Sequence, residues 1–307
     1  TKPVTAVALM ILYDEGKFVL DDPVSAYLPE FKHIEVYSTE GDVPLLEEQV
    51  EEMTIRHLLT HTSGIIYGWG GSYVDSLYRT TEVGSWETVL EDNMKILAGL
   101  PLKFQPGTAW EYGLSIDVAG YLVEVLSGLP LDSFFKTRIF DPLSMDDTGF
   151  YVPEEKHDRL TELYFRDEEG KLKPGGEWGE RYKKPAIHFS GGGGLVSTMD
   201  DYLSFCTMLL NGGELNGSRI LEESTVKLIM SDQLPPDIEY GEGSGYGLAG
   251  HVDLESGEYS WAGAASTNFW IDPSNQLIVI TMSQLMPSDH SYAHVYMDLV
   301  RRALIKE

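Results

Sequence analysis

The sequence predicts an α+β fold, in which a helix-rich body comes before a small antiparallel sheet and a closing helix. Apolar residues with helical spacing dominate the chain up to about Gly241. After this point, short runs of β-branched and aromatic residues alternate with turn residues. We therefore expect a mainly helical domain over residues 1–240 and a sheet with a C-terminal helix over residues 241–307.

The helical body is expected to begin with a helix from Lys2 to Gly16. Pro3 is tolerated in a first turn, and Gly16 can end the helix. A turn and a short helix follow at residues 21–28. Helical spacing predicts further helices at residues 54–60, 86–98, 116–126, 131–138, 198–210, 222–230 and 292–305.

Four strands are expected in the C-terminal part of the chain, at residues 246–252, 258–261, 267–271 and 277–282. Turn residues such as those at 272–275 separate them. Four strands with one helix make a thin sheet. We therefore expect strands from a segment before Thr1 to complete it.

The composition indicates one large domain or two closely packed ones. The chain has 307 residues, 42% of them hydrophobic, which is enough apolar material for a large core. No apolar run reaches the roughly 20 residues of a membrane-spanning helix. The first residues lack the basic start and the cleavage site of a signal peptide. A cytoplasmic location is expected, and any signal peptide would lie upstream of Thr1.

The charge argues against nucleic acid and anionic membranes as partners. A net charge of −27, from 49 acidic and 22 basic residues, repels nucleic acid and anionic membranes. The one cysteine, Cys206, cannot form an internal disulfide. It lies in an apolar helical pattern, so we expect a buried thiol and not a nucleophile.

Four segments carry the pattern on which the functional hypothesis depends. They are Thr1-Lys2-Pro3-Val4-Thr5-Ala6, Thr54-Ile55-Arg56-His57-Leu58-Leu59-Thr60-His61-Thr62-Ser63-Gly64, Trp110-Glu111-Tyr112-Gly113-Leu114-Ser115 and Trp261-Ala262-Gly263-Ala264. In this order they resemble motifs of the class C β-lactamase-related serine hydrolases, in the carboxylesterase branch known as family VIII. The resemblance covers nearly the whole chain. It implies a fold like that of β-lactamases and penicillin-binding proteins, with a helical domain packed on an antiparallel sheet flanked by helices.

The resemblance implies that Lys2 is catalytic. The nucleophile of this family lies in a Ser-x-x-Lys motif at a helix N-terminus, and Thr1 and Lys2 resemble its last two positions. The serine would then lie two residues before Thr1, so the chain resembles an N-terminally truncated member. Residues three apart share a helix face, which would place the lysine beside the serine oxygen. A desolvated lysine there can take the serine's proton.

The resemblance also implies that Tyr112 is the family's catalytic tyrosine, on a loop that enters a helix. Beside a lysine, this phenol would share the role of general base and later protonate the leaving group. Many family members carry Asn two residues after the tyrosine, where this chain has Leu114. A leucine cannot hydrogen-bond a substrate amide, which weakens the case for β-lactam or peptide substrates.

The third motif is expected to line the substrate cleft with Trp261, Gly263 and Ala264. β-Lactamases carry Lys-Thr-Gly here, and family VIII esterases carry the Trp-x-Gly form that this chain has. Gly263 would keep the strand edge clear for substrate. The Ala264 N–H, with that of the serine, would form the oxyanion hole. The neutral Trp261 favours uncharged esters.

Other patterns are interpreted as structural. His57 and His61 lie four apart, as a metal site on a helix could have them, but the family pattern has no acidic third ligand nearby. The resemblance therefore implies a structural role for this segment, and we expect no metal and no cofactor. The glycine run at residues 191–194 lacks the Lys and Ser/Thr of a phosphate loop. It is expected to lead into a helix that Ser197 or Thr198 caps.

The leading hypothesis is a serine carboxylesterase that acts on a small-molecule ester through an acyl-enzyme. β-Lactamase, D-amino-acid peptidase and transesterase activities share this mechanism and remain alternatives. Thr1 as an N-terminal nucleophile is a further alternative. A chain without its nucleophilic serine would be inactive by itself.

Overall fold

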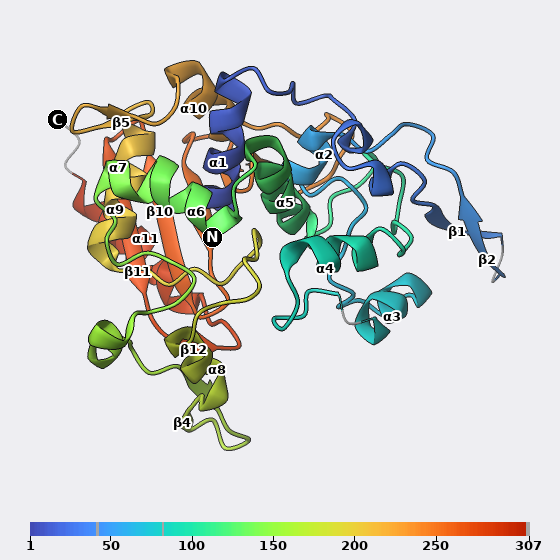
Figure 1. Cartoon of the computed structure of the whole chain (residues 1–307). Coiled ribbons are helices and arrows are strands. Elements are labelled where there is room, and N and C mark those ends of the chain that lie inside the picture. Colours follow the sequence, from blue (N-terminus) through green and yellow to red (C-terminus); the bar gives the residue numbers. More distant parts are fainter. Residues whose placement is uncertain (41–42, 82, 305–307) are drawn as a thin grey trace.

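The structure is a computed structural model that describes residues 1–40, 43–81 and 83–304. Two lobes lie side by side, and the N-terminus lies between them (Figure 1). One lobe holds the main β-sheet and its covering helices. The other holds α2 to α5 and the hairpin of β1 and β2. This α+β arrangement confirms the predicted fold class.

Helix α1, Lys2–Asp14, lies in the centre of the molecule. Its first eleven residues are all buried, because its sequence is apolar on every side. The helix packs against α5 (Ser115–Ser127), α6 (Leu131–Phe135) and α10 (Glu223–Ile229). Burial of the entire helix holds its first residues at the junction of the two lobes.

The main sheet has five antiparallel strands in the order β11-β10-β9-β8-β7. They are β7 (Ser244–Tyr246), β8 (His251–Asp253), β9 (Tyr259–Ala262), β10 (Thr267–Asp272) and β11 (Leu277–Met282). The prediction of a single strand at residues 246–252 is wrong, because this segment turns back as a hairpin between β7 and β8. The Gly247 N–H donates to the Gly250 carbonyl at 2.8 Å, and Ala249 takes a φ of 61°.

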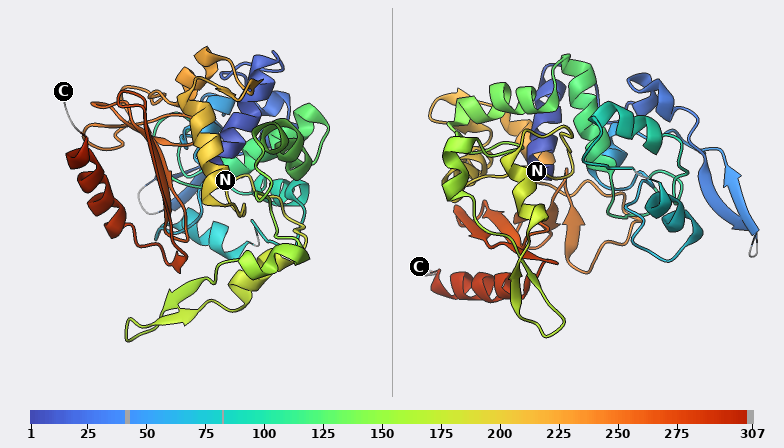
Figure 2. Two further views of the ribbon diagram at one scale, coloured as in Figure 1. Left: turned by 90° about the vertical axis from the view of Figure 1, so that its left-hand side faces the viewer. Right: turned by 60° about the horizontal axis from the view of Figure 1, so that its bottom comes forward.

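Helices cover both faces of this sheet (Figure 2, left). Helix α9 (Met199–Leu210) packs on one face against β10 and β11, and α11 (Ser291–Ala303) lies on the other. The predicted end of the last helix at Ile305 lies outside the described residues. The outer edge of β11 pairs with no other strand in the described part of the chain. Completion of the sheet by strands from before Thr1 stays a prediction.

Several elements were not predicted from the sequence. They are the hairpin of β1 (Val36–Glu40) and β2 (Val43–Glu47), helix α3 (Tyr73–Thr80), and a small sheet of β12 (Leu285–Met286), β3 (Tyr164–Arg166) and β4 (Leu172–Pro174). The remaining elements are α2 (Ile55–Leu59), α4 (Leu90–Leu97), α7 (Asp141–Leu143), α8 (Glu177–Glu180), β5 (Glu214–Leu215) and β6 (Ser218–Arg219).

No single helix among the described residues is long and apolar enough to cross a membrane. The pair formed by α5 and residues 131–143 has the length and composition, but it is bent by 78°. Cys206 is fully buried in α9, as expected, and burial raises the pKa of its thiol.

Candidate active site

Lys2 lies at the start of α1 with only 4% of its surface exposed. Its Nζ donates a hydrogen bond to the Gly192 carbonyl at 2.6 Å and another to the Tyr67 hydroxyl at 3.2 Å. The same atom lies 4.5 Å from the centre of the Tyr112 ring. The structure thus brings the two residues that the sequence singled out as catalytic into direct contact.

The surroundings of Lys2 favour its ammonium form. Burial acts to lower its pKa, but the electrostatic interactions of Lys2 with Tyr67, Tyr112 and Asp117 outweigh burial and raise it. The interaction is mutual, so the ammonium also stabilises a phenolate next to it. Burial outweighs the effect of Lys2 at Tyr67 and raises the pKa of that phenol to about 12. Tyr67 therefore stays a neutral partner of Lys2 near neutral pH.

The glycine run holds the carbonyl that binds Lys2. Asp117, in the first turn of α5, accepts hydrogen bonds from the Ser190 hydroxyl at 2.5 Å and from the Gly192 N–H at 3.1 Å. A Cβ on Gly192 would lie 2.3 Å from the Asp117 carboxylate. Only glycine permits this close approach. The purely structural interpretation of this run is therefore incomplete, since it positions Lys2.

The first turn of α1 is fastened to the same glycine run. The Thr5 hydroxyl donates to the Gly191 carbonyl at 2.7 Å, and the Thr1 hydroxyl accepts from the Leu195 N–H at 3.1 Å. Thr198, farther along, caps α9 by accepting from the Asp201 N–H, as one of the two predicted caps. The bonds of Thr1 and Thr5 fix the position of Lys2 relative to this loop.

Tyr112 lies on a loop that leads into α5, as expected. A Cβ on the next residue, Gly113, would lie 2.2 Å from the Ile65 carbonyl oxygen, so the loop can press against this segment only with glycine there. The His61 carbonyl accepts from the Glu111 N–H at 3.0 Å, and His61 Nδ1 accepts from the Gly113 N–H at 3.4 Å. His61 therefore positions the tyrosine loop from both sides.

The third predicted segment also lies at this place. The ring of Trp261, on β9, is 5.5 Å from that of Tyr112. The exposed Ala264 follows the strand, and its N–H has no hydrogen-bond acceptor among the described residues. A Cβ on Gly263 would lie 2.2 Å from the Thr267 hydroxyl, so the turn itself requires glycine there.

A comparison with known protein families shows to which family a chain with this site belongs. The family model described as Beta-lactamase matches residues 1–302. The chain belongs to the Beta-lactamase family.

Relatives within the family include esterases. Esterase EstB of Burkholderia gladioli is 30% identical over 311 residues, which span 92% of this chain and 75% of that protein. Protein Rv1367c of Mycobacterium tuberculosis is 34% identical, over 94% of this chain and 76% of that protein. A solved structure described as "EstCE1, a hydrolase with promiscuous acyltransferase activity" superposes with a TM-score of 0.79 at 25% identity, covering 97% of this chain and 82% of that one. Membership of this family, together with these relatives, supports ester hydrolysis or acyl transfer as the general activity of this chain.

The two histidines of the segment at residues 54–64 have structural roles in the candidate site. His57 Nδ1 accepts from the Thr54 N–H at 3.2 Å, which completes a capping box at the start of α2. His61 is fully buried, and burial together with the charge of Lys2 lowers the pKa of its ring well below 6.5. The described residues contain no group of three or more side chains suited to hold a metal ion.

The buried His61 predicts a dependence of stability on pH. Above pH 6.5 the His61 ring is neutral in both the folded and the unfolded chain. Below pH 6.5 the unfolded chain takes up a proton on this ring, whereas the folded chain excludes it. The free energy of unfolding should therefore fall as the pH falls below 6.5. His61 has a φ of 56°, a backbone conformation that asparagine tolerates. We expect His61→Asn to reduce this slope by up to about 1.4 kcal/mol per pH unit in urea unfolding.

The control for this prediction is the exposed His33, and His33→Asn should leave the slope unchanged. Burial also lowers the pKa of His57, His188 and His251, so part of the slope should survive in the His61 variant. An unchanged slope in His61→Asn would show that this ring does not stay neutral in the folded chain.

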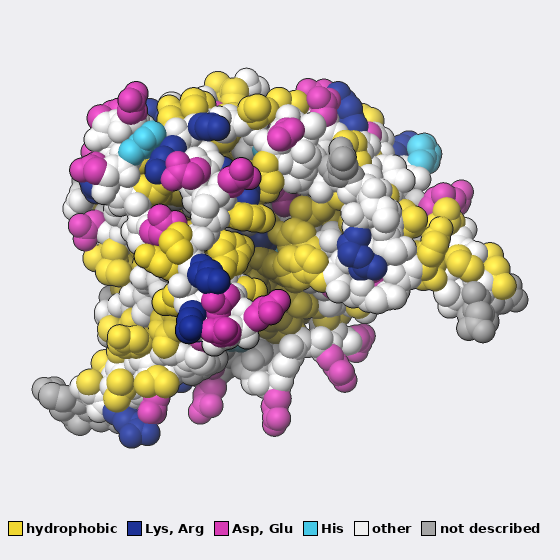
Figure 3. Space-filling model, turned by 90° about the horizontal axis from the view of Figure 1, so that it is seen from below, with side chains coloured by type: hydrophobic (Ala, Val, Ile, Leu, Met, Phe, Trp, Pro, Cys, Tyr) yellow, Lys and Arg dark blue, Asp and Glu magenta, His cyan; other side chains and the backbone are white. Residues whose placement is uncertain are grey.

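Sequence reasoning missed three residues around Lys2: Tyr67, Asp117 and Trp69. Tyr67 and Trp69 stack, with ring centres 4.5 Å apart and planes 12° apart. With Tyr112 and Trp261 they make the surroundings of Lys2 strongly aromatic. From below, the molecule is hollowed between its two lobes, and hydrophobic side chains line the hollow (Figure 3). Asp117 had a readable signal, since it lies in the predicted first turn of a helix five residues after Tyr112.

Proposed function

We propose that this protein is a serine hydrolase that cleaves carboxylic esters of small molecules through an acyl-enzyme. The observation that carries the proposal is the buried ammonium of Lys2 at the start of α1, in contact with two phenols. A fixed charge in a site from which water is largely excluded stabilises developing negative charge far better than the same charge in water.

The nucleophile in this proposal is a serine two positions before Thr1, as the family resemblance implies. A residue three positions before Lys2 lies on the same helix face when the helix continues by one turn. The hydrogen bonds of Thr5 to Gly191 and of Thr1 to Leu195, directly after the glycine run, hold this end of α1 in place. The serine oxygen would then lie at the helix N-terminus, where backbone N–H groups favour negative charge.

Acylation follows from this arrangement. Tyr112, as a phenolate paired with the Lys2 ammonium, takes the serine proton while the serine oxygen bonds to the ester carbonyl carbon. The N–H groups of Ala264 and of the serine stabilise the resulting oxyanion. Tyr112 then gives the proton to the alkoxide oxygen, and the alcohol leaves. Water then attacks the acyl-enzyme with the same proton transfers and completes the hydrolysis. Alternatively, a second alcohol takes the acyl group in an acyl transfer.

The site favours uncharged substrates. Trp261 takes the place at which β-lactamases carry a lysine, and Leu114 offers no amide to a substrate. Aromatic rings surround the reacting groups, and such walls bind apolar esters by burying their surface. We therefore infer a neutral ester as the partner and assign no part to nucleic acid, a membrane or a cofactor.

A fluorophosphonate probe tests the nucleophile directly. We expect peptide mass spectrometry of the labelled protein to find one adduct, on a serine two residues before Thr1. The label should be lost in the Ser→Ala variant at that position. An adduct on Thr1 would instead support an N-terminal nucleophile. Ser133 in α6 and Ser224 in α10 also begin Ser-x-x-Lys sequences. Labelling of either serine would contradict the proposed site.

A further inference from the structure

Trp69 is an exposed tryptophan beside the candidate active site. It leaves 74% of its surface exposed, although a ring of this size gains much from burial. One face of the indole stacks on Tyr67, which accepts the hydrogen bond from Lys2. The ring centre lies 6.0 Å from that of Tyr112. The indole is thus largely exposed close to the candidate reacting groups.

The backbone on either side of Trp69 is packed closely onto α3. Gly68 has a φ of 80°, and a Cβ there would lie 2.7 Å from the Asp75 carbonyl oxygen. A Cβ on Gly70 would lie 2.6 Å from the Asp75 carboxylate. Both contacts are too short for any residue with a side chain. The two glycines let the loop of residues 67–72, here termed the Trp69 loop, lie tightly on the helix.

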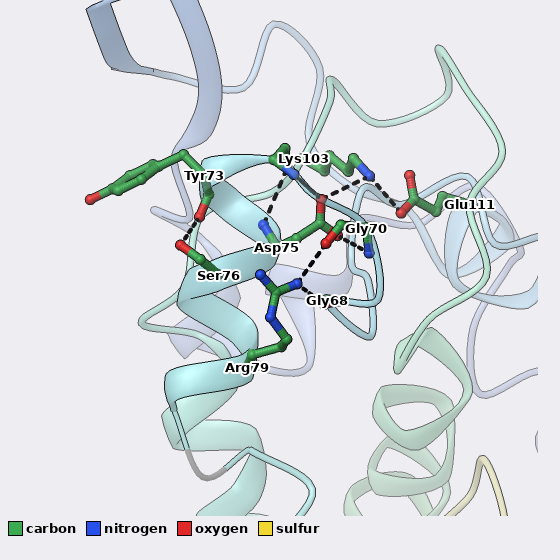
Figure 4. A network of polar contacts seen from close by, with 9 residues as sticks. Gly68, Gly70, Tyr73, Asp75, Ser76, Arg79, Lys103 and Glu111 are labelled. Carbon is green, nitrogen blue, oxygen red and sulfur yellow. Dashed lines mark hydrogen bonds and ion pairs between the residues drawn. The ribbon is translucent and has the colours of Figure 1, made fainter. Parts of the chain in front are cut away.

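Arg79 holds the Trp69 loop from the helix. Its Nη1 donates to the Gly68 carbonyl at 2.5 Å and to the Gly70 carbonyl at 2.6 Å, one on each side of Trp69 (Figure 4). A planar guanidinium with fixed donor directions suits such a double contact. The position of Trp69 is therefore set by the backbone bonds of its two neighbours.

The same network joins the Trp69 loop to the tyrosine loop. Asp75 accepts from the Gly70 N–H at 3.0 Å and pairs with Lys103 at 3.4 Å (Figure 4). Lys103 also pairs with Glu111 at 2.7 Å, and Glu111 directly precedes Tyr112. Asp75 is fully buried, so the ion pair of Asp75 with Lys103 is shielded from solvent on one side. An ordered exposed ring is thereby linked to the candidate general base.

We propose that Trp69 is a specificity-determining residue, a fixed platform on which a flat aromatic group of the ester stacks. This inference rests on the proposed ester hydrolysis. Binding costs less when the receptor side chain is already ordered, and the Arg79 clamp orders Trp69 without substrate. A flat ring on the open face would extend the stack of Tyr67 and Trp69, whereas a flexible alkyl chain gains only the burial of its area. The ring can belong to the acyl or to the alcohol part.

The test compares matched pairs of esters in the full-length enzyme. The first pair, 2-naphthyl acetate and octyl acetate, places the ring in the alcohol, and the second, ethyl 2-naphthoate and ethyl nonanoate, places it in the acyl part. We expect Trp69→Ala to lower kcat/KM about tenfold for the naphthyl ester of one pair and less than about threefold for its alkyl partner. The pair that responds identifies the part that stacks. Equal losses for aromatic and alkyl esters in both pairs would overturn the proposal.

Two further variants separate stacking from general damage. Tyr73→Ala is the matched control, because Tyr73 is an exposed aromatic residue at the start of α3 that points away from the network (Figure 4). It should leave the ratio of aromatic to alkyl ester unchanged. Arg79→Ala should lower this ratio when Trp69 is present and should have no further effect in the Trp69→Ala background. An equal effect of Arg79→Ala in both backgrounds would show that the clamp does not act through Trp69.

A binding measurement separates this proposal from the proposed function. Methyl 2-naphthyl ketone has the flat ring but no ester bond, so its binding requires no hydrolysis. We expect its Kd, from calorimetric titration, to rise about tenfold in Trp69→Ala and to change little in Trp69→Phe. If no ester is cleaved but the ketone shows this pattern, the hydrolase proposal fails and the platform stands. If esters are cleaved but the ketone binds all variants equally, the platform fails alone.

Discussion

Replacement of Lys2 by Met should lower kcat/KM for a simple alkyl ester by roughly 10³-fold, within the range that positioned proton-transfer groups contribute. Lys2 Nζ is the only ammonium in contact with the two phenols among the described residues, and its hydrogen bonds fix it between Gly192 and Tyr67. Methionine has nearly the same length and no charge. The measurement is steady-state hydrolysis of the ester near neutral pH.

The fold should survive this substitution, because the replacement of a buried charge by an apolar residue of similar volume is often neutral or stabilising. Far-ultraviolet circular dichroism and the Tm check this point. Lys17→Met, on an exposed lysine just beyond the end of α1, is the matched control and should retain full activity. Loss of less than about tenfold in Lys2→Met, with the fold intact, would remove Lys2 from the proposed mechanism.

Replacement of Tyr112 by Phe should lower kcat/KM by roughly 10²-fold to 10³-fold. The ring contacts to His61, Tyr67 and Trp261 lie at 4.9, 5.3 and 5.5 Å and survive the substitution. The variant therefore removes the hydroxyl while it keeps the packing. A loss in kcat with KM nearly unchanged is the pattern expected for an interaction made in the transition state.

Tyr67→Phe provides the comparison, since it also removes one hydroxyl from a ring next to Lys2. Because burial raises the pKa of Tyr67 to about 12, this phenol is a poor base near neutral pH. We expect a loss of about tenfold from the weakened positioning of Lys2. A larger loss in Tyr67→Phe than in Tyr112→Phe would exchange the roles of the two tyrosines.

The helices of the core were readable from the sequence because their apolar spacing and their ends are local features. Helix α5 was placed within one residue at each end, and Gly128 follows it with a φ of 73°. The hairpin of β1 and β2 was missed because every residue of β2 is exposed, so no alternation marks it. Helix α3 had a readable start in Ser72 and Asp75, which form a capping box.

The candidate site was readable only in part. Lys2, Tyr112 and Trp261 each lie in a motif of several residues, so resemblance to a family marked them. Tyr67, Trp69 and Gly192 lie in loops without a spacing that distinguishes them from ordinary turn residues. The contacts of Tyr67 and Gly192 with Lys2, and of Trp69 with Tyr112, join segments far apart in the chain.

The sequence by itself determined the α+β class, the apolar helix that carries Lys2, and the family to which the chain belongs. Each depends on patterns of neighbouring residues, which the sequence shows directly at successive places along the chain. The tertiary structure alone decided which carbonyl holds the lysine, which second phenol lies beside it, and which loop presents an exposed tryptophan. These features depend on close approaches at Gly192, Gly113 and Gly68, where the absence of a Cβ lets distant segments touch. A glycine in a sequence shows that such freedom exists, and only the folded chain shows which atom uses it.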